Sequence, residues 1–286
     1  MEAETRDRVG IGWRPELAAG ILAHLDEIDV VEVIADDLLA APKARLRAVR
    51  TLAAQVSVML HGVSLGLASS FPVDEARLGR IARVIDAIEP ELWSEHLAFV
   101  RAGGLEIGHL ASPPRTDETV EGAARNIWRA ASVVGRAPLL ENVATIVQPP
   151  GTMNEAEWTS AVLDASGGLL LLDLHNLHAN ATNFAFDARR FVDQTAPRGP
   201  SLVHLAGGRL IPAGDGSLRI LDDHLHATPE PVFELLEHVA ERAQGPLTVV
   251  LERDGRYPSI EELLLELTRA REALAKGRER KSRKVA

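Results

Sequence analysis

Residues 168–183 read GLLLLDLHNLHANATN, and the rest of the chain is organised around this stretch. Its first five residues are small or apolar and read as a buried strand, and Asp173, His175, Asn176 and His178 follow within six positions. A strand buried on both faces normally ends in a turn rich in Gly, Pro or Asn. This one ends in four groups that can bind a cation, so the sequence predicts a metal site at its carboxyl end.

The composition restricts both the partners and the metal ligands. The 286 residues are 46% hydrophobic, enough for a large core. The net charge of −10 would repel a phosphate backbone, and no apolar run approaches the roughly 20 residues that span a membrane. We therefore expect no nucleic-acid partner, no membrane, and a soluble, cytoplasmic protein. The chain has no cysteine, so any metal ion must be held by nitrogen and oxygen ligands.

Short apolar runs alternate with amphipathic stretches along the whole chain, which is typical of repeated βα units with a parallel sheet. The predicted strands are 9–13, 30–35, 57–61, 92–97, 138–143, 169–174, 202–206 and 247–252. The predicted helices are 15–25, 42–54, 74–88, 118–134, 154–165, 187–194, 229–243 and 259–275. Eight such units in about 250 residues match the size of a (β/α)₈ barrel.

No composition shift or Ser/Gly-rich linker divides the sequence. We therefore predict an α/β fold with a single (β/α)₈ TIM-barrel domain over residues 1–275. The last segment, 276–286, reads KGRERKSRKVA; it is basic and lacks apolar periodicity. It is predicted to be a disordered tail.

In a (β/α)₈ barrel the carboxyl ends of the strands converge on one face, where the βα loops build the active site. Six consecutive units of this sequence place His or carboxylate residues there. The set is His61, His96, Glu141, Asp173, His204 and Glu252, with Asp222 and His224 in the loop after the seventh strand. Four imidazoles and four carboxylates without a thiolate suit zinc, iron or manganese, and they are too many for one ion. We expect carboxylates that bridge two or three ions.

Each of these residues has a structural alternative when it is considered alone. A histidine at a strand end is more often a hydrogen-bonded core residue than a ligand, and Arg253 beside Glu252 could form a structural ion pair. His175 is expected to face away from the ligands because side chains alternate along a strand. His178 and Asn180, placed in the following loop, are predicted to contact substrate.

With these motifs in view, the chain resembles the multinuclear non-heme iron-dependent oxidative enzymes (MNIO), the family that includes the iron subunit of methanobactin biosynthesis. The resemblance runs from about Gly10 to Leu267, through GIGWR, HGVSL, SEHLAF, LLENV, LLDLHNLHANATN, VHLAGG, DDH and LERD. The family is similar in fold to the xylose-isomerase-like TIM barrels. The resemblance implies O₂-dependent oxidation of a residue, often cysteine, in a ribosomally synthesised precursor peptide, commonly with a small partner protein that recruits the peptide.

The resemblance also implies about two to three iron ions of mixed valence, Fe(II) and Fe(III), with O₂ as co-substrate. The implied ligand sets are His61, His96 and a bridging Glu141; Glu141, Asp173, His204 and Glu252; and Asn176, Asp222 and His224. Asp254 and Arg253 would be catalytic residues, beside the metal ligands or facing the substrate. The sequence departs from many relatives at His175, where Asn is common, and at His178, where an aromatic residue is usual.

Three other classes fit part of the pattern. Endonuclease IV resembles the chain in fold and ligand order but binds three zinc ions, with His in place of Asn176. Phosphodiester hydrolysis would require basic residues around the mouth of the barrel to meet phosphates, and the net negative charge of the chain argues against DNA as a substrate. A metal-dependent sugar isomerase usually has a lysine near the strand ends, whereas the lysines here are Lys43, Lys276, Lys281 and Lys284. A peptide-binding module without metal is the remaining alternative.

Overall fold

The computed structural model describes residues 6–102, 105–196, 199–214 and 216–285. Eight parallel strands form a closed barrel in the order β1-β12-β9-β8-β7-β4-β3-β2. These strands are β1 (Arg8–Gly12), β2 (Val30–Ile34), β3 (Ser57–Gly62), β4 (Trp93–His96), β7 (Leu139–Glu141), β8 (Leu169–Asp173), β9 (Leu202–Leu205) and β12 (Thr248–Leu251). The predicted (β/α)₈ barrel is confirmed, and each predicted strand is found to within about two residues at its ends.

The helices follow the strands as the alternating pattern predicts. They are η1 (Pro15–Leu17), α1 (Ala18–Ala23), η2 (Asp36–Leu38), α2 (Lys43–Ala53), α3 (Glu75–Ile88), α4 (Asp117–Val134), α5 (Glu155–Ser166), α6 (Leu174–Phe184), α7 (Ala188–Thr195), α8 (Glu230–Arg242) and α9 (Ile260–Val285). Polar residues cap the amino ends of several of them, as where Asp74 accepts the Arg77 N–H and Asn154 accepts the Glu157 N–H. Among the described residues no helix has the length and apolarity to cross a membrane.

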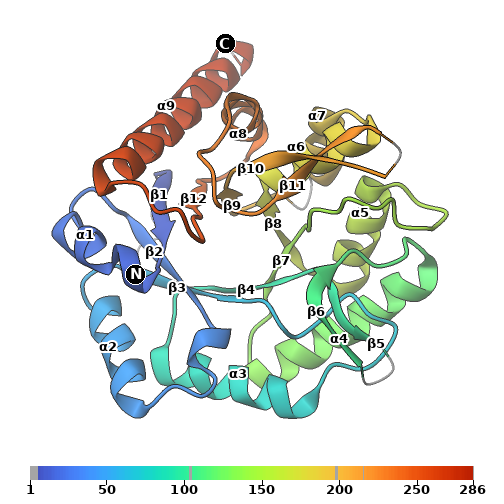
Figure 1. Cartoon of the computed structure of the whole chain (residues 1–286), viewed down its shortest axis with the longest axis horizontal. Helices are drawn as coiled ribbons and strands as arrows, with labels where there is room; N and C mark the ends of the chain where they lie inside the picture. Colours follow the sequence, from blue (N-terminus) through green and yellow to red (C-terminus); the bar gives the residue numbers. More distant parts are fainter. Residues whose placement is uncertain (1–5, 103–104, 197–198, 215, 286) are drawn as a thin grey trace. The chain divides into compact units, whose positions relative to one another are not determined.

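The chain divides into two compact units. Unit 1 contains Met1–Val30, Ala144–Gln148 and Leu172–Ala286, and unit 2 contains Val31–Val143 and Pro149–Leu171. Within unit 1, α8 lies along α9, and α6 packs against the strand β11 (Leu218–Asp222; Figure 1). Within unit 2, α4 packs against both α3 and α5.

One helix was not predicted from the sequence. Helix α6 begins directly at the end of β8, because the Asp173 side chain accepts the Asn176 N–H at 2.6 Å and so caps the first turn. His178 and Asn180 therefore lie in a helix, and the prediction that they belong to a loop is wrong.

Two β-hairpins, also not predicted, stand outside the barrel. In unit 2, β5 (Phe99–Ala102) pairs antiparallel with β6 (Leu105–Ala111). In unit 1, β10 (Gly208–Pro212) pairs antiparallel with β11 (Leu218–Asp222). The second hairpin follows β9 after two residues and ends on Asp222, a predicted metal ligand.

The basic segment at the carboxyl end differs from the predicted disordered tail. Helix α9 continues to Val285, and its basic residues bind α8 and the segment that follows it: Lys276 and Arg280 pair with Glu237, and Lys284 pairs with Glu241. The apolar pattern ends near residue 275, but ion pairs between α8 and α9 extend the helix beyond it. Ala286 lies outside the described residues.

Arg278 is the residue of this segment with the most contacts, so its removal tests the helical extension. Its guanidinium bonds both carboxylate oxygens of Asp7, at 2.6 and 3.0 Å, and the carbonyls of Ala240, Ala243 and Gly245. We expect Arg278→Ala to lower the free energy of unfolding by about 1–3 kcal/mol, measured by urea denaturation.

The matched control for that measurement is Arg283→Ala. Arg283 is exposed and lies 3.7 Å from Glu279 on the same helix, a pair of little energetic value. Its loss is expected to change the free energy of unfolding by less than about 0.5 kcal/mol. Equal effects of the two substitutions would contradict a specific role for Arg278.

Candidate metal centre

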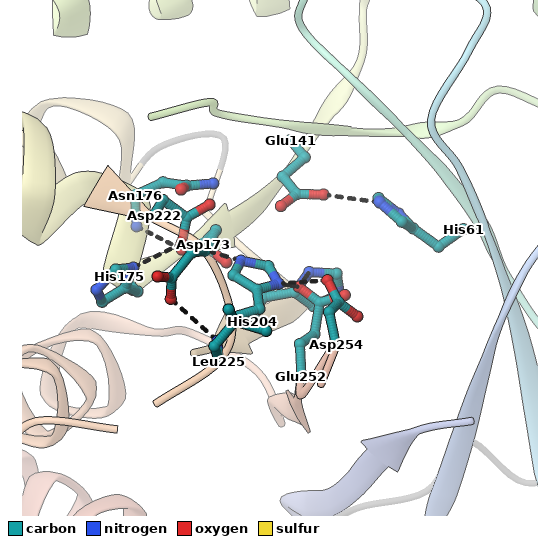
Figure 2. Close-up of polar contacts among 12 residues, drawn as sticks. His61, Glu141, Asp173, His175, Asn176, His204, Asp222, Leu225, Glu252 and Asp254 are labelled. Carbon is teal, nitrogen blue, oxygen red and sulfur yellow. Dashed lines mark hydrogen bonds and ion pairs between the residues drawn. The ribbon is translucent and has the colours of Figure 1, made fainter. Parts of the chain in front are cut away.

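In unit 2, the carboxyl ends of β3, β4 and β7 bring together His61, His96 and Glu141, here called the His61 cluster. Both imidazoles direct Nε2 at the same carboxylate oxygen, Oε2 of Glu141, from 3.2 Å for His61 and 3.4 Å for His96. The strand register explains the arrangement, because His96 lies directly opposite Glu141 and His61 lies on the next strand. All three side chains are buried, and Figure 2 shows the contact of His61 with Glu141.

The other ring nitrogen of each imidazole has a polar neighbour of its own, and for His96 this neighbour indicates the tautomer. Nδ1 of His96 lies 3.3 Å from the Gly62 carbonyl, which can only accept, so this nitrogen carries the hydrogen. Nδ1 of His61 lies 2.8 Å from the Ser94 hydroxyl. In the neutral His96 ring, the Nε2 lone pair therefore faces a carboxylate oxygen. A cation or a shared proton must lie between them, and this donor set fits a metal ion.

In unit 1, a second group of residues with side chains that could bind a metal, here called the Glu252 cluster, consists of Asp173, His204, Asp222, His224 and Glu252. Asp173, His204 and Glu252 offer ligand atoms that all lie within 4.8 Å of one another, and all three residues are buried. Nδ1 of His204 lies 3.1 Å from Oε2 of Glu252. These residues come from the ends of three barrel strands, β8, β9 and β12 (Figure 2).

His224 connects Asp222 with the end of β12. Its Nε2 lies 3.0 Å from Oδ1 of Asp222, and its Nδ1 lies 3.6 Å from Oε2 of Glu252 and 3.2 Å from Oδ2 of Asp254. Burial alone would lower the pKa of His224, but the charges of Asp222 and Glu252 raise it well above its usual value. The ring thus sits among carboxylates that favour a positive charge, which a metal ion would supply in place of the proton.

The backbone of His224 is held in an unusual conformation. Its φ of 53° lies in the left-handed region that non-glycine residues rarely adopt. The carbonyl of the same residue accepts the Asp254 N–H at 2.9 Å, which helps to hold it there. Strain of this kind is typical of sites where function fixes a side chain.

His175 lies against the Glu252 cluster, contrary to the expectation that it faces away. Its Nδ1 is 2.8 Å from Oδ1 of Asp222, and its side chain is buried. The alternation of a strand does not apply to His175, because α6 has already begun at Leu174. Burial would raise the pKa of Asp222, but the charge of His224 and hydrogen bonds from both histidines hold it well below its usual value. His175 therefore positions an ionised Asp222.

The residues of α6 that were predicted as ligand or substrate contacts have different surroundings. Asn176 is buried on the first turn, next to Asp173, as its predicted role requires. His178 is half-buried, and burial, with the nearby charge of His175, lowers its pKa, so it can meet a substrate as a neutral imidazole. Asn180 is fully buried and accepts the Thr145 N–H, so the structure gives it a role in the scaffold in place of the predicted substrate contact.

The two residues predicted as catalytic, Asp254 and Arg253, also have different surroundings. The Asp254 side chain is 44% exposed and has one oxygen directed at His224. Burial would raise the pKa of Asp254, but the hydrogen bond from His224 and the charge of Arg14 lower it. Arg253 is buried and donates to Glu266 of α9 at 2.8 Å. Arg253 therefore forms a structural ion pair, as the alternative reading of the sequence allowed. Its partner is Glu266 and not Glu252.

Arg14 belongs to this region, although its role was not deduced from the sequence. It follows β1, and its guanidinium donates through Nε to Oδ1 of Asp254 at 2.8 Å, and also through Nη2. Nη2 lies 3.9 Å from Oε1 of Glu252. Arg14 therefore fixes the carboxylate of Asp254 from the side opposite His224. The motif GIGWR contains Arg14, but no local pattern indicates a partner 240 positions away.

Glu95 is a buried carboxyl beside the His61 cluster that was not predicted as a ligand. Its oxygens accept the N–H groups of Leu65 and His96, and it packs so closely against Gly62 that a Cβ there would lie 2.6 Å from it. Burial, and then the negative charge of Asp36, raise the pKa of Glu95 well above its usual 4.5.

The raised pKa of Glu95 has a measurable effect on stability. The folded metal-free protein retains a proton that the unfolded chain releases above pH 4.5, so this residue destabilises the fold progressively as the pH rises above that value. Gln does not titrate. We therefore expect Glu95→Gln to gain stability relative to the native protein from pH 5 upward, by about 1.4 kcal/mol for each unit of pKa shift. Urea denaturation across this pH range measures the difference, and a difference independent of pH would contradict the prediction.

These features define the class of the protein, a xylose-isomerase-like TIM barrel with buried histidines and carboxylates that could hold metal ions. Solved structures of this fold are similar over nearly the whole chain. D-psicose 3-epimerase from Clostridium cellulolyticum H10 has a TM-score of 0.61 at 14% identity and covers 96% of this chain and 99% of its own. A xylose isomerase domain protein from Planctomyces limnophilus has a TM-score of 0.61 at 13% identity, with 98% and 99% covered. At this identity, the likeness shows the fold alone.

The chain belongs to the family of RiPP precursor modification enzymes MbnB/TglH/ChrH, whose model matches residues 8–275. Its relatives include a UPF0276 protein of Streptomyces avermitilis, 37% identical over 278 residues, and one of Rhizorhabdus wittichii, 33% identical over 246 residues. The matches cover 94% and 86% of this chain, and 55% and 86% of the relatives. The chain thus spans about half the length of the Streptomyces protein. The predicted family is confirmed, and the protein is an enzyme of this class.

Proposed function

We propose that this protein is a multinuclear non-heme iron enzyme that uses O₂ to oxidise a residue, expected to be cysteine, of a ribosomally synthesised precursor peptide. Membership of a family of precursor-modifying enzymes supports the peptide substrate. The donor set of the two clusters, imidazole and carboxylate without thiolate, supports iron. A small partner protein that recruits the peptide completes the proposal.

The observation that carries the proposal is the convergence of two imidazoles on one carboxylate oxygen of Glu141. A carboxylate so placed would hold one ion together with His61 and His96, and would remain available to a second ion. On neighbouring strands β7 and β8, Glu141 is paired with Leu171. Leu171 lies two positions before Asp173, a residue of the Glu252 cluster. We therefore propose Glu141 as the ligand that bridges two irons.

The remaining ligands follow from the contacts in the Glu252 cluster. Asp173, His204 and Glu252 would hold the second iron with Glu141, and Asp222, His224 and Asn176 would hold a third. His175 would orient Asp222 from behind, as second partners of metal ligands commonly do. Iron would supply the redox chemistry and the Lewis acidity that oxidation by O₂ requires.

Asp254 is a partly exposed carboxylate beside the Glu252 cluster that could accept a proton from the substrate. Its carboxylate is ionised at neutral pH, since Arg14 and His224 lower its pKa, and its side chain is partly exposed. Arg14 would keep the carboxylate in place while the proton arrives at Oδ2. The chain contains no cysteine of its own, so a substrate thiolate would be the sole thiolate able to bind the metal.

Protein purified without oxygen tests the proposal directly. Elemental analysis with Mössbauer spectroscopy is expected to find about two to three irons per chain with mixed valence. Exposure to O₂ with a Cys-containing precursor peptide is then expected to change the peptide mass, as measured by mass spectrometry. Stoichiometric zinc without iron would favour a hydrolase, and the absence of any bound metal would overturn the ligand assignment.

A further inference from the structure

Two loops of unit 1 meet beside the Glu252 cluster and contact each other at three successive positions. The first loop, residues 223–229, follows β11, and the second, residues 252–259, follows β12. At the first position, Nδ1 of His224 lies 3.2 Å from Oδ2 of Asp254, and the Asp254 N–H donates to the His224 carbonyl at 2.9 Å. The side chain and the main chain of His224 are thus both attached to the second loop.

The next two positions continue the contact between the loops. A Cβ on Gly255 would lie 2.9 Å from the Leu225 side chain, and Nη1 of Arg256 lies 3.4 Å from Nε2 of His226. His224 and Arg256 both have a positive φ, 53° and 45°, and such strained backbone persists only where its surroundings hold it. Each loop therefore holds the other, and a displacement of one loop displaces both.

Glu266 of α9 attaches both loops to the outer helices. Its Oε1 accepts from Nη2 of Arg253 at 2.8 Å, and its Oε2 accepts the Thr228 N–H at 2.9 Å. Arg253 stands between Glu252 and Asp254 in the second loop, and Thr228 lies near the end of the first, two residues before α8. Glu266, Arg253 and Thr228 are all buried, so one carboxylate anchors both loops out of contact with water.

Arg253 depends on Glu266 for its place in the structure. Within the described part of the chain, Glu266 is the one ion-pair partner of the Arg253 guanidinium, and Nε of Arg253 has no hydrogen-bond partner. A buried guanidinium that loses its carboxylate is strongly unfavourable, so without Glu266 the Arg253 side chain would leave its present position. Glu252 and Asp254, its two neighbours in the chain, would then shift with it.

We propose that Glu266 is a positioning residue for the metal ion that the Glu252 cluster holds. By fixing Arg253 and Thr228, it sets the positions of Glu252 in the second loop and of His224 in the first. Glu266 acts only through these loops and contacts neither the metal nor the substrate. The inference rests on the metal ligands named in the proposed function, but not on iron, O₂ or the peptide.

Titration of the metal-free protein with Co(II) tests the inference without iron, O₂ or a known substrate. Co(II) binds imidazole and carboxylate ligands, and its visible absorption depends on its coordination geometry. In Glu266→Gln the amide keeps one acceptor oxygen but turns an N–H donor toward the other loop, so only one loop stays anchored. We expect Co(II) to bind the Glu252 cluster about tenfold more weakly in this variant, with an altered absorption band.

The His61 cluster serves as an internal reference in the same titration. The binding step that disappears in His96→Ala identifies this cluster, and its Co(II) affinity is expected to stay within about twofold of native in Glu266→Gln.

Two further variants separate positioning from stability. Glu237→Gln removes ion pairs of α8 with Lys276 and Arg280 of α9 but contacts neither loop, so it is expected to keep the native Co(II) affinity. Glu266→Gln combined with Arg253→Met removes the buried charge that the single variant leaves unpaired. Its stability in urea is expected to return toward that of the native protein, while Co(II) binding at the Glu252 cluster stays about tenfold weaker.

The outcomes distinguish this inference from the proposed function. Equal Co(II) affinity in the native protein and in Glu266→Gln, or an equal loss at both clusters, overturns the positioning role while the ligands remain assigned. If the double variant regains the native Co(II) affinity together with its stability, Glu266 contributes stability alone and the inference is rejected. A native protein that binds no Co(II) rejects the proposed ligands, and the positioning role with them.

Discussion

Glu141→Gln is expected to lose about half or more of the bound iron and to oxidise the precursor peptide at least roughly a thousandfold more slowly, which corresponds to about 4 kcal/mol of activation free energy. The substitution preserves the size of a buried side chain but removes its charge and replaces one oxygen by an amide nitrogen, which is not a metal ligand. Both imidazoles that now face Oε2 would lose the ligand they share with the metal. Iron analysis and peptide mass spectrometry measure the two effects.

Glu95→Gln is the matched control for this experiment. Glu95 lies on β4 directly before His96 in the sequence, is equally buried, and has a pKa raised above its usual value by burial, so Gln imitates its protonated form. Its variant is expected to retain the native iron content. If the two variants lose iron equally, the loss of iron results from a general disturbance of the buried residues, and the role of Glu141 as a bridging ligand is rejected.

Asp222→Asn is expected to remove one iron and to slow peptide oxidation by roughly a hundredfold or more, about 2.7 kcal/mol. One oxygen of Asp222 now lies 2.8 Å from Nδ1 of His175 and 3.0 Å from Nε2 of His224, and an amide oxygen without charge would hold neither ring as well. The signal of the His61 cluster in the Mössbauer spectrum is expected to remain, because its ligands are unchanged.

The neighbouring residue supplies the control for this variant. Asp223 has the same chemistry, but its carboxylate pairs with Arg209 and His226, which lie outside the Glu252 cluster. Asp223→Asn is therefore expected to retain the full iron content. A loss of iron in Asp223→Asn as large as that in Asp222→Asn would show that the charge of the loop, and not the ligand, controls metal binding.

The barrel could be predicted from the sequence because its strands are buried on both faces and so appear as uninterrupted apolar runs such as LLLLD at 169–173. Helix α6 was missed because it begins without a loop and is rich in His and Asn, which obscure an apolar period. One local signal was present: Asp173 stands three residues before Asn176 as an N-cap.

The gathering of the proposed ligands at the strand ends could be predicted for the same reason as the strands, since a polar group at the end of a buried strand needs a partner. The direction in which a side chain points could not be predicted from the sequence. Arg253 and Asp254 are neighbours in the sequence, yet one binds Glu266 in the scaffold and the other contacts His224. Arg14 meets Asp254 only because barrel closure brings β1 beside β12, a contact between the two ends of the chain.

The hairpin β10–β11 has a base that is fixed beside Asp222 and a distal turn that can vary. Its base is fixed by the pairing of Gly208 with Asp222, whereas at its distal end the Ala213 N–H donates to the Ser217 carbonyl and the Gly216 N–H donates to the Ala213 carbonyl. Residues inserted or removed at the distal end would change the length of the hairpin without shifting the register at the base. During evolution, a chain built in this way can vary at one turn while the position of Asp222 is inherited unaltered.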